Sequence, residues 1–302
     1  MPNCSLQGIG SSLAVAANEV ASWQRASSQV GAVSQCDKPP LLEHQHIVRA
    51  KTLLANLLQD GAPMQRLPGA ATNTRLQWTI ACGLHVLAKG VHGDFAETGV
   101  YLGGTSIAMM SVLREHQSDK THWACDSFQG LPAPNTQDVW LGTTRIPASG
   151  LPKALCRAKQ GADVVGCGNP RRGLFKANES TFLSNVAHFG LPTTPPRLRI
   201  VKGWFHESLP PAGMGNLSML RLDGDLFVST MAVLKRLYPR VSPGGIVFVD
   251  DMGSYAGCAA AVNSYRAAHN ISAPLHKLHE QHTGFRRFEA VFWVKGAVGG
   301  LR

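Results

Sequence analysis

The chain has 302 residues, of which 44% are hydrophobic and 16% are charged. This composition excludes a wholly disordered chain, and no apolar run approaches the ~20 residues that span a bilayer. Lys and Arg outnumber Asp and Glu by 29 to 19, so the net charge is +10. Nucleic-acid binding would favour basic residues interleaved with stacking aromatics. The densest basic cluster lacks Trp and Tyr between its members, which are Lys153, Arg157, Lys159, Arg171, Arg172 and Lys176. A nucleic-acid partner is therefore the less favoured interpretation.

The cysteines and the first residues bear on the compartment. The seven cysteines form no CxxC pair, so neither a disulfide framework nor a structural zinc site is expected. The first 20 residues place no basic residue before their short apolar patch, unlike a secretory signal. We expect an intracellular, cytoplasmic protein with reduced thiols, and organelle targeting stays open.

In chain order, residues 1–40 are rich in Ser, Ala and Gln and predict a flexible tail. Residues 41–60 carry apolar side chains at helical spacing, and residues 75–89 predict a second helix that Gly90 ends. Residues 41–90 would thus form a helical N-terminal cover, or a contact surface for a homo-oligomer.

From residue 91 to 302 the pattern alternates between strands and helices. Strands are predicted at 94–98, 122–125, 198–201, 219–222 and 245–249, and helices at 104–116, 179–189, 226–238 and 257–270. Residues 274–279 and 290–294 predict a closing antiparallel pair. The fold class is α/β and Rossmann-like, with a mostly parallel doubly wound sheet, that antiparallel C-terminal pair and the N-terminal helical extension. Such sheets bind ligands beyond the carboxyl ends of their strands.

Residues 133–177 interrupt this alternation with repeated Gly and Pro and with the basic cluster. A structureless stretch of this length inside a domain is uncommon, and it is often functional. We interpret it as an insertion that orders over a substrate as a lid, and a decoration without function is the alternative.

The first two strand ends carry a ligand-binding pattern. The first reads Glu97-x-Gly99, followed after three intervening residues by the pair Gly103-Gly104, so a ligand can approach the backbone closely. An acidic residue at this turn suits a cationic ligand, such as the sulfonium and amino groups of S-adenosylmethionine. Asp126 ends the second strand, where a carboxylate can hold a ribose diol. Simple turn or cap roles are the alternatives.

Four acidic residues follow two later strands. Asp223 and Asp225 follow the fourth predicted strand, and Asp250 and Asp251 follow the fifth. Neighbouring parallel strands would bring these carboxylates to one edge, where a divalent cation would balance their charge. An oxygen-only ligand set favours Mg²⁺. Asp225 could instead cap the following helix.

Several stretches resemble the macrocin O-methyltransferase (TylF/MycF-like) family. They are GDFAETGVYLGG, DSFQGLP, VKGWFHESLP, LRLDGDLFVSTMAVLKRLYPRVSPGG and IVFVDDMGSYAGC. The resemblance implies a class I methyltransferase fold that uses S-adenosylmethionine and Mg²⁺ to methylate a small hydroxylated acceptor such as a sugar, often as a homo-oligomer. The sequence departs from the family in three places, which are residues 68–74, residues 281–287 and the insertion. These departures concern the identity of the acceptor.

The resemblance also implies roles for individual residues. The cofactor would be lined by Glu97, Thr98, Gly99, Val100, Tyr101, Asp126, Ser127, Phe128, Gln129 and Gly130, with Gly203 and Trp204 near its adenine. Asp223, Asp250 and Asp251 would hold the metal, and Asp223 is also the candidate catalytic base. His206 and His282 are alternative bases.

We therefore expect a Mg²⁺-dependent S-adenosylmethionine O-methyltransferase acting on a hydroxyl of a small molecule. One alternative is a basic RNA-binding protein or RNA methyltransferase, which the net charge of +10 motivates. Another is a methyltransferase fold that binds ligands without catalysis, against which the intact acidic residues argue.

Overall fold

The computed structural model describes residues 42–59, 73–138, 146–147, 163–164, 170–279 and 288–296. The chain divides into Met1–Leu41 and Leu42–Arg302, and all described residues belong to the second unit. The predicted tail at residues 1–40 lies outside the described residues. In the described part, no helix combines the length and the apolar character that crossing a membrane requires.

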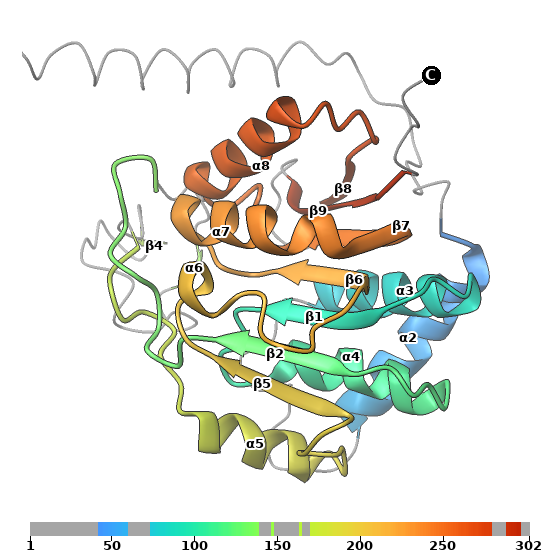
Figure 1. The fold of residues 1–302 in the computed structure, drawn as a ribbon. Helices are drawn as coiled ribbons and strands as arrows, with labels where there is room; N and C mark the ends of the chain where they lie inside the picture. Colours follow the sequence, from blue (N-terminus) through green and yellow to red (C-terminus); the bar gives the residue numbers. More distant parts are fainter. Residues whose placement is uncertain are drawn as a thin grey trace, which may run out of the picture. The chain divides into compact units, whose positions relative to one another are not determined.

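The centre of the fold is a seven-stranded sheet with the order β5-β2-β1-β6-β7-β9-β8 (Figure 1). Its first five strands run parallel, and β9 pairs antiparallel with both β7 and β8. The strands are β1 Asp94–Thr98, β2 His122–Asp126, β5 Leu198–Lys202, β6 Leu217–Leu222, β7 Val241–Val249, β8 His276–His279 and β9 Phe288–Val294. The parallel sheet and the closing antiparallel pair confirm the predicted fold class.

Helices cover both faces of this sheet. They are α2 His44–Gln59, α3 Asn73–Ala88, α4 Gly104–Glu115, α5 Glu179–His188, α6 Phe205–Ser208, α7 Phe227–Leu237 and α8 Ala256–Ala268, with the short 3-10 helix η1 Tyr238–Arg240 after α7. One apolar cluster joins the first four helices to Phe95 and Phe248 of the sheet. The other joins α7 and α8 to Leu220, Val247 and Trp293. Removal of these side chains from water on both faces stabilises the sheet.

The central strands are therefore buried along most of their length rather than on alternate residues. All six residues of β6 are buried, and one of them is Arg221, whose side chain is 0% exposed. A charge at such a position is costly unless it is paired with opposite charges and hydrogen-bonded. Its partners lie at the carboxyl edge of the sheet.

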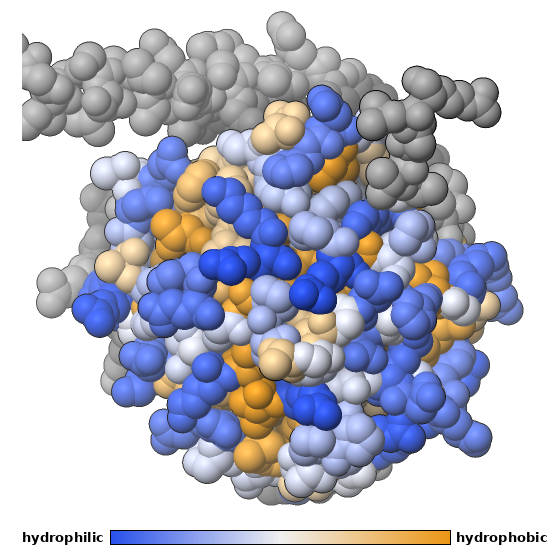
Figure 2. Space-filling model, viewed as in Figure 1, coloured by the Kyte–Doolittle hydropathy of each residue, from blue (hydrophilic) through white to orange (hydrophobic). Residues whose placement is uncertain are grey.

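The predicted insertion begins and ends at one narrow neck. Leu131 and Leu174 form a backbone hydrogen bond of 2.8 Å, and the Gly173 N–H donates to the Leu131 carbonyl at 2.9 Å. Between them, β3 Ile146–Pro147 and β4 Asp163–Val164 pair antiparallel as a separate two-stranded sheet, which the sequence analysis did not predict. Figure 2 shows a mainly hydrophilic face with small hydrophobic groups.

Candidate functional site

The loops that follow the parallel strands gather at the carboxyl edge of the sheet. Tyr101 after β1, Phe128 after β2 and Asp225 after β6 all have positive φ values, of 48°, 55° and 55°. Such backbone conformations are costly for residues other than glycine and concentrate at functional sites. Of the six described non-glycine residues with positive φ, these three lie at the edge that the sequence analysis selected for ligand binding.

Gly99 brings the loops after β1 and β6 into contact. Its φ is 89°, and a Cβ atom added there would overlap the carbonyl oxygen of Asp223. The Asp223 N–H in turn donates to the Thr98 carbonyl at 2.9 Å. This close crossing of two backbones requires glycine.

Asp126 ties the loops after β1 and β2 together. One carboxylate oxygen, Oδ2, accepts the N–H groups of Val100 at 2.8 Å and Tyr101 at 3.2 Å. The other, Oδ1, accepts the N–H of Phe128 at 2.7 Å. A carboxylate has about four acceptor positions, so the side chain that was predicted to hold a ribose already has most of them occupied.

The remaining predicted cofactor residues lie along the same edge. The Ser127 hydroxyl accepts the Gln129 N–H at 3.0 Å and donates to the Gly130 carbonyl at 3.1 Å, which closes a tight turn after β2. The Gly203 N–H donates to the Asp126 carbonyl at 3.0 Å, so the start of the loop that contains Trp204 is fastened beside β2.

Glu97 lies below the surface of this edge. It shares the sheet face of Phe95, because side chains alternate along a strand, and it is buried beneath α4. It accepts hydrogen bonds from Ser106 and from Arg221. Burial raises the pKa of Glu97 to about 7, although the Arg221 charge opposes this. The Glu97 carboxylate thus already has two partners within the protein, and its role at the cofactor stays a prediction.

Arg221 is the residue that the sequence analysis missed. Its Nη1 donates to Glu97 Oε1 at 2.9 Å and to Asp223 Oδ2 at 2.7 Å. Its Nη2 donates to Asp250 Oδ1. The signal available was one charged residue inside an otherwise apolar strand, LSMLRL. The guanidinium compensates three carboxylates and fixes two of the predicted metal ligands.

Asp250 is separated from the other predicted ligands by these contacts. Its second oxygen accepts a hydrogen bond from Arg75 of α3, and Arg75 also lies 3.4 Å from the Glu289 carboxylate of β9. The carboxylate of Asp250 is thus held between two arginines, and the structure does not bring it into the acidic group as predicted. Consecutive residues direct their side chains to different sides of an extended chain, so Asp250 and Asp251 diverge.

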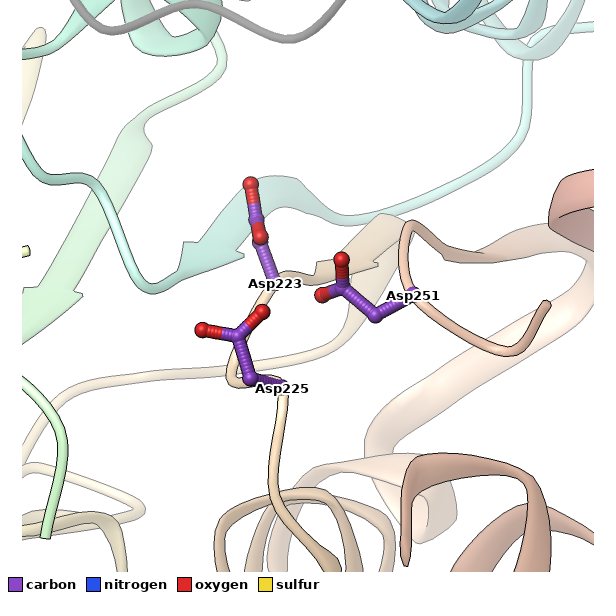
Figure 3. Close-up of side chains that lie close together, drawn as sticks. All are labelled: Asp223, Asp225 and Asp251. Atoms are coloured by element: carbon purple, nitrogen blue, oxygen red, sulfur yellow. The ribbon is translucent and has the colours of Figure 1, made fainter. Parts of the chain in front are cut away.

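Asp225 takes the place that was predicted for Asp250. Asp223, Asp225 and Asp251 each offer one carboxylate oxygen, and these three atoms lie within 4.8 Å of one another (Figure 3). The first N–H of α7, that of Phe227, donates to Asp138 Oδ1 at 2.7 Å rather than to Asp225. We call these three residues the acidic cluster.

The electrostatics of the acidic cluster are unfavourable without a cation. Asp225 is 7% exposed and Asp251 6%, and the Asp223 side chain is 29% exposed. Burial and the neighbouring carboxylates raise the pKa of Asp225 to about 8 and that of Asp251 well above its usual range. Asp251 Oδ2 is buried and has no hydrogen-bond partner among the described residues. A hard divalent cation fits both this orphaned oxygen and the oxygen-only donor set.

Of the two alternative bases, the structure describes only His206. His206 lies on α6 with its side chain exposed, 3.4 Å from the carboxylate of Glu207. His282 lies outside the described residues.

Comparison with known proteins identifies the family. The sequence model of the Macrocin-O-methyltransferase (TylF) family matches residues 57–145 and 149–287. Demethyldecarbamoylnovobiocin O-methyltransferase of Streptomyces niveus is 36% identical over 202 residues, which are 67% of this chain and 68% of that protein. Mycinamicin III 3''-O-methyltransferase of Micromonospora griseorubida is 32% identical over 207 residues, or 68% of this chain and 73% of that protein.

Solved structures agree with this assignment. The O-methyltransferase NovP has a TM-score of 0.59 at 28% identity, covering 84% of this chain and 98% of that one. The calicheamicin methyltransferase CalS11 has a TM-score of 0.53 at 16% identity, covering 88% and 100%, and it shows the fold alone. The predicted class I methyltransferase fold is therefore confirmed, and the chain belongs to the macrocin O-methyltransferase (TylF) family.

Proposed function

We propose that the protein transfers a methyl group from S-adenosylmethionine to a hydroxyl of a small molecule, a sugar moiety of a natural product, with the help of Mg²⁺. The observation that carries the metal is the acidic cluster, above all the buried and unpartnered Asp251 Oδ2. The acceptor class is supported by the relatives, whose names give demethyldecarbamoylnovobiocin and mycinamicin III as the molecules that they methylate.

Asp223, Asp225 and Asp251 would hold the metal. This set keeps two of the predicted ligands and has Asp225 in place of Asp250. Asp250 would instead hold the guanidinium of Arg221 in position. When bound, S-adenosylmethionine supplies an electrophilic methyl group, and Mg²⁺ supplies positive charge that lowers the pKa of an acceptor hydroxyl.

The residues of the chain would orient the donor and receive the proton. Asp126 Oδ1 accepts a single N–H, and Oδ2 already accepts two, so a ribose hydroxyl would find its acceptor on Oδ1. Asp223 is the most exposed of the three acids and is our candidate base. Arg221 holds Asp223 Oδ2, so Oδ1 would be the oxygen available to the metal and to the acceptor hydroxyl.

The insertion would contribute to acceptor binding. Phe175, on its returning end, packs edge-on against Tyr101 of the cofactor loop, with ring centroids 5.7 Å apart. The neck at Leu131 and Leu174 fixes where the insertion leaves the sheet edge. We propose that residues 133–177 cover the bound acceptor. We also propose that the protein works in the cytoplasm as a homo-oligomer.

Calorimetry tests this function. S-adenosylmethionine should bind the protein without metal, and Mg²⁺ should bind wild type but not Asp251→Asn. Methylation should then appear by mass spectrometry in a screen of deoxysugar and polyol acceptors. Activity that persists in EDTA would remove the metal from the mechanism. Failure to bind S-adenosylmethionine would favour a fold that has lost catalysis.

A further inference from the structure

Three aromatic residues in and beside the cofactor loops have left-handed backbone conformations. Tyr101 after β1, Phe128 after β2 and Phe175 on the returning end of the insertion have φ values of 48°, 55° and 59°. They are half of the six described non-glycine residues with positive φ. This conformation is costly for a bulky side chain, and such costs are retained at sites that hold ligands.

The returning end of the insertion is fastened to the loop after β2. The Gly173 N–H donates to the Leu131 carbonyl at 2.9 Å, and the Leu131 N–H donates to the Leu174 carbonyl at 2.8 Å. Gly130 permits this close approach, because a Cβ atom added there would lie 2.5 Å from the Leu174 carbonyl oxygen. Phe175 therefore follows a segment whose position is fixed by backbone contacts.

From this position the Phe175 ring reaches the loop after β1. Its centroid lies 5.7 Å from that of the Tyr101 ring, and the two planes meet at 73°. Phe175 is nevertheless 37% exposed, and in the described part of the chain it shares this exposure among large hydrophobic residues only with Val48 and Val228. Phe175 thus connects the two loops that the family resemblance assigns to the cofactor, while more than a third of the residue stays in solvent.

This combination is unfavourable without a ligand. The exposed part of the ring gains no hydrophobic stabilisation, and the left-handed backbone adds its own cost. A ligand that buried the ring would offset both. S-adenosylmethionine offers two suitable groups, an adenine ring that stacks on aromatic side chains and a sulfonium cation that is attracted to their faces.

We propose that Phe175 is a cofactor-contacting residue, whose ring joins that of Tyr101 in packing against bound S-adenosylmethionine. This inference rests on the proposed use of that cofactor and does not depend on the metal. It gives the insertion a role at the methyl donor, in addition to the role proposed for it at the acceptor.

The test is calorimetry on the full chain without metal, with S-adenosylmethionine and S-adenosylhomocysteine as the two probes. We expect Phe175→Ala to weaken the binding of S-adenosylmethionine about fivefold or more, which corresponds to the loss of one aromatic contact. Phe175→Tyr keeps the ring and should stay within about twofold of wild type. An equal loss for both probes places the ring on the part that they share, and a loss confined to S-adenosylmethionine places it at the sulfonium. Either result supports the contact.

Phe189→Ala is the matched control. Phe189 follows the opposite end of α5, and its ring also makes an edge-on contact, with His188 at a centroid distance of 5.6 Å. This variant should bind both probes as wild type does. Equal weakening by Phe189→Ala, or affinities of Phe175→Ala within about twofold of wild type for both probes, would overturn the proposal.

Phe175→Gly separates a ligand contact from a structural role. Glycine adopts a φ of 59° without strain, so the melting temperature of the ligand-free variant should be at or above that of Phe175→Ala. Its affinity for S-adenosylmethionine should stay as low as that of Phe175→Ala. An affinity that recovers together with the melting temperature would refute the contact.

The wild-type titration distinguishes this inference from the proposed function. If wild type binds neither probe, the proposed function fails, and the inference fails with it. If wild type binds S-adenosylmethionine and the Phe175 variants bind it equally well, the inference alone is refuted.

Discussion

The buried imidazole of His122 makes the protein sensitive to acid in a calculable way. His122 is the first residue of β2, and its Nε2 lies 3.1 Å from the Ser106 hydroxyl, which donates to Glu97. Burial lowers the pKa of His122 to about 3, from an ordinary value of 6.5. The folded protein therefore holds this ring neutral over a range in which the unfolded chain protonates it.

The sign and size of the effect follow from proton linkage. Below pH 6.5 the unfolded state binds one more proton than the folded state, so the free energy of unfolding falls as the pH falls. Each pH unit contributes ~1.4 kcal/mol, so between pH 6.5 and pH 5 the loss from His122 is about 2 kcal/mol. Glu97 acts in the opposite direction, because its raised pKa of about 7 makes the folded state bind the extra proton from pH 7 down to about 4.5.

The contribution of His122 to the pH dependence must be separated from that of Glu97. The informative quantity is therefore the difference in the free energy of unfolding between wild type and a His122 variant. His122→Gln retains a donor towards Ser106 but does not titrate. Denaturant unfolding at pH 8, 7, 6 and 5 should show the advantage of wild type over this variant shrinking by about 2 kcal/mol between pH 8 and pH 5. His206→Gln, at an exposed position, serves as the control and should run parallel to wild type. Parallel profiles for wild type and His122→Gln would refute the reasoning.

Three further predictions concern the site itself. Arg221→Met should lower the free energy of unfolding by about 3–5 kcal/mol in denaturant, because it leaves the charges of Glu97 and two aspartates without compensation. A loss under about 1 kcal/mol would contradict the conclusion that Arg221 compensates these three carboxylates. Gly99→Ala should abolish methyl transfer and lower the melting temperature, because the added Cβ atom overlaps the Asp223 carbonyl oxygen. Gly215→Ala is the control: its Cβ atom meets open space, so neither methyl transfer nor the melting temperature should change. Mg²⁺ at 100 times its dissociation constant should stabilise wild type by about 2.7 kcal/mol in a thermal-shift assay, and it should leave the stability of Asp251→Asn unchanged. Equal stabilisation of both proteins would argue against the acidic cluster as the metal site.

The sequence by itself determined the fold class and the edge at which to search. Alternating strand and helix patterns predicted the parallel sheet, because apolar periodicity is a local property of the chain and parallel strands must be covered on both faces. The motifs after β1, β2, β6 and β7 also sufficed for the family, whose sequence model matches residues 57–145 and 149–287.

Which aspartates meet was decided by the tertiary structure alone. Asp250 and Asp251 are indistinguishable as sequence neighbours, yet one is held by Arg221 and Arg75 and the other joins the acidic cluster. Asp225 was open to capping α7, yet its carboxylate lies in the acidic cluster, and the Phe227 N–H donates to Asp138 of a distant segment. A carboxylate turns to whichever partners the folded chain brings within hydrogen-bonding distance. Those partners come from other strands and loops, so local pattern predicts the edge of the sheet while packing selects the side chains that form the site.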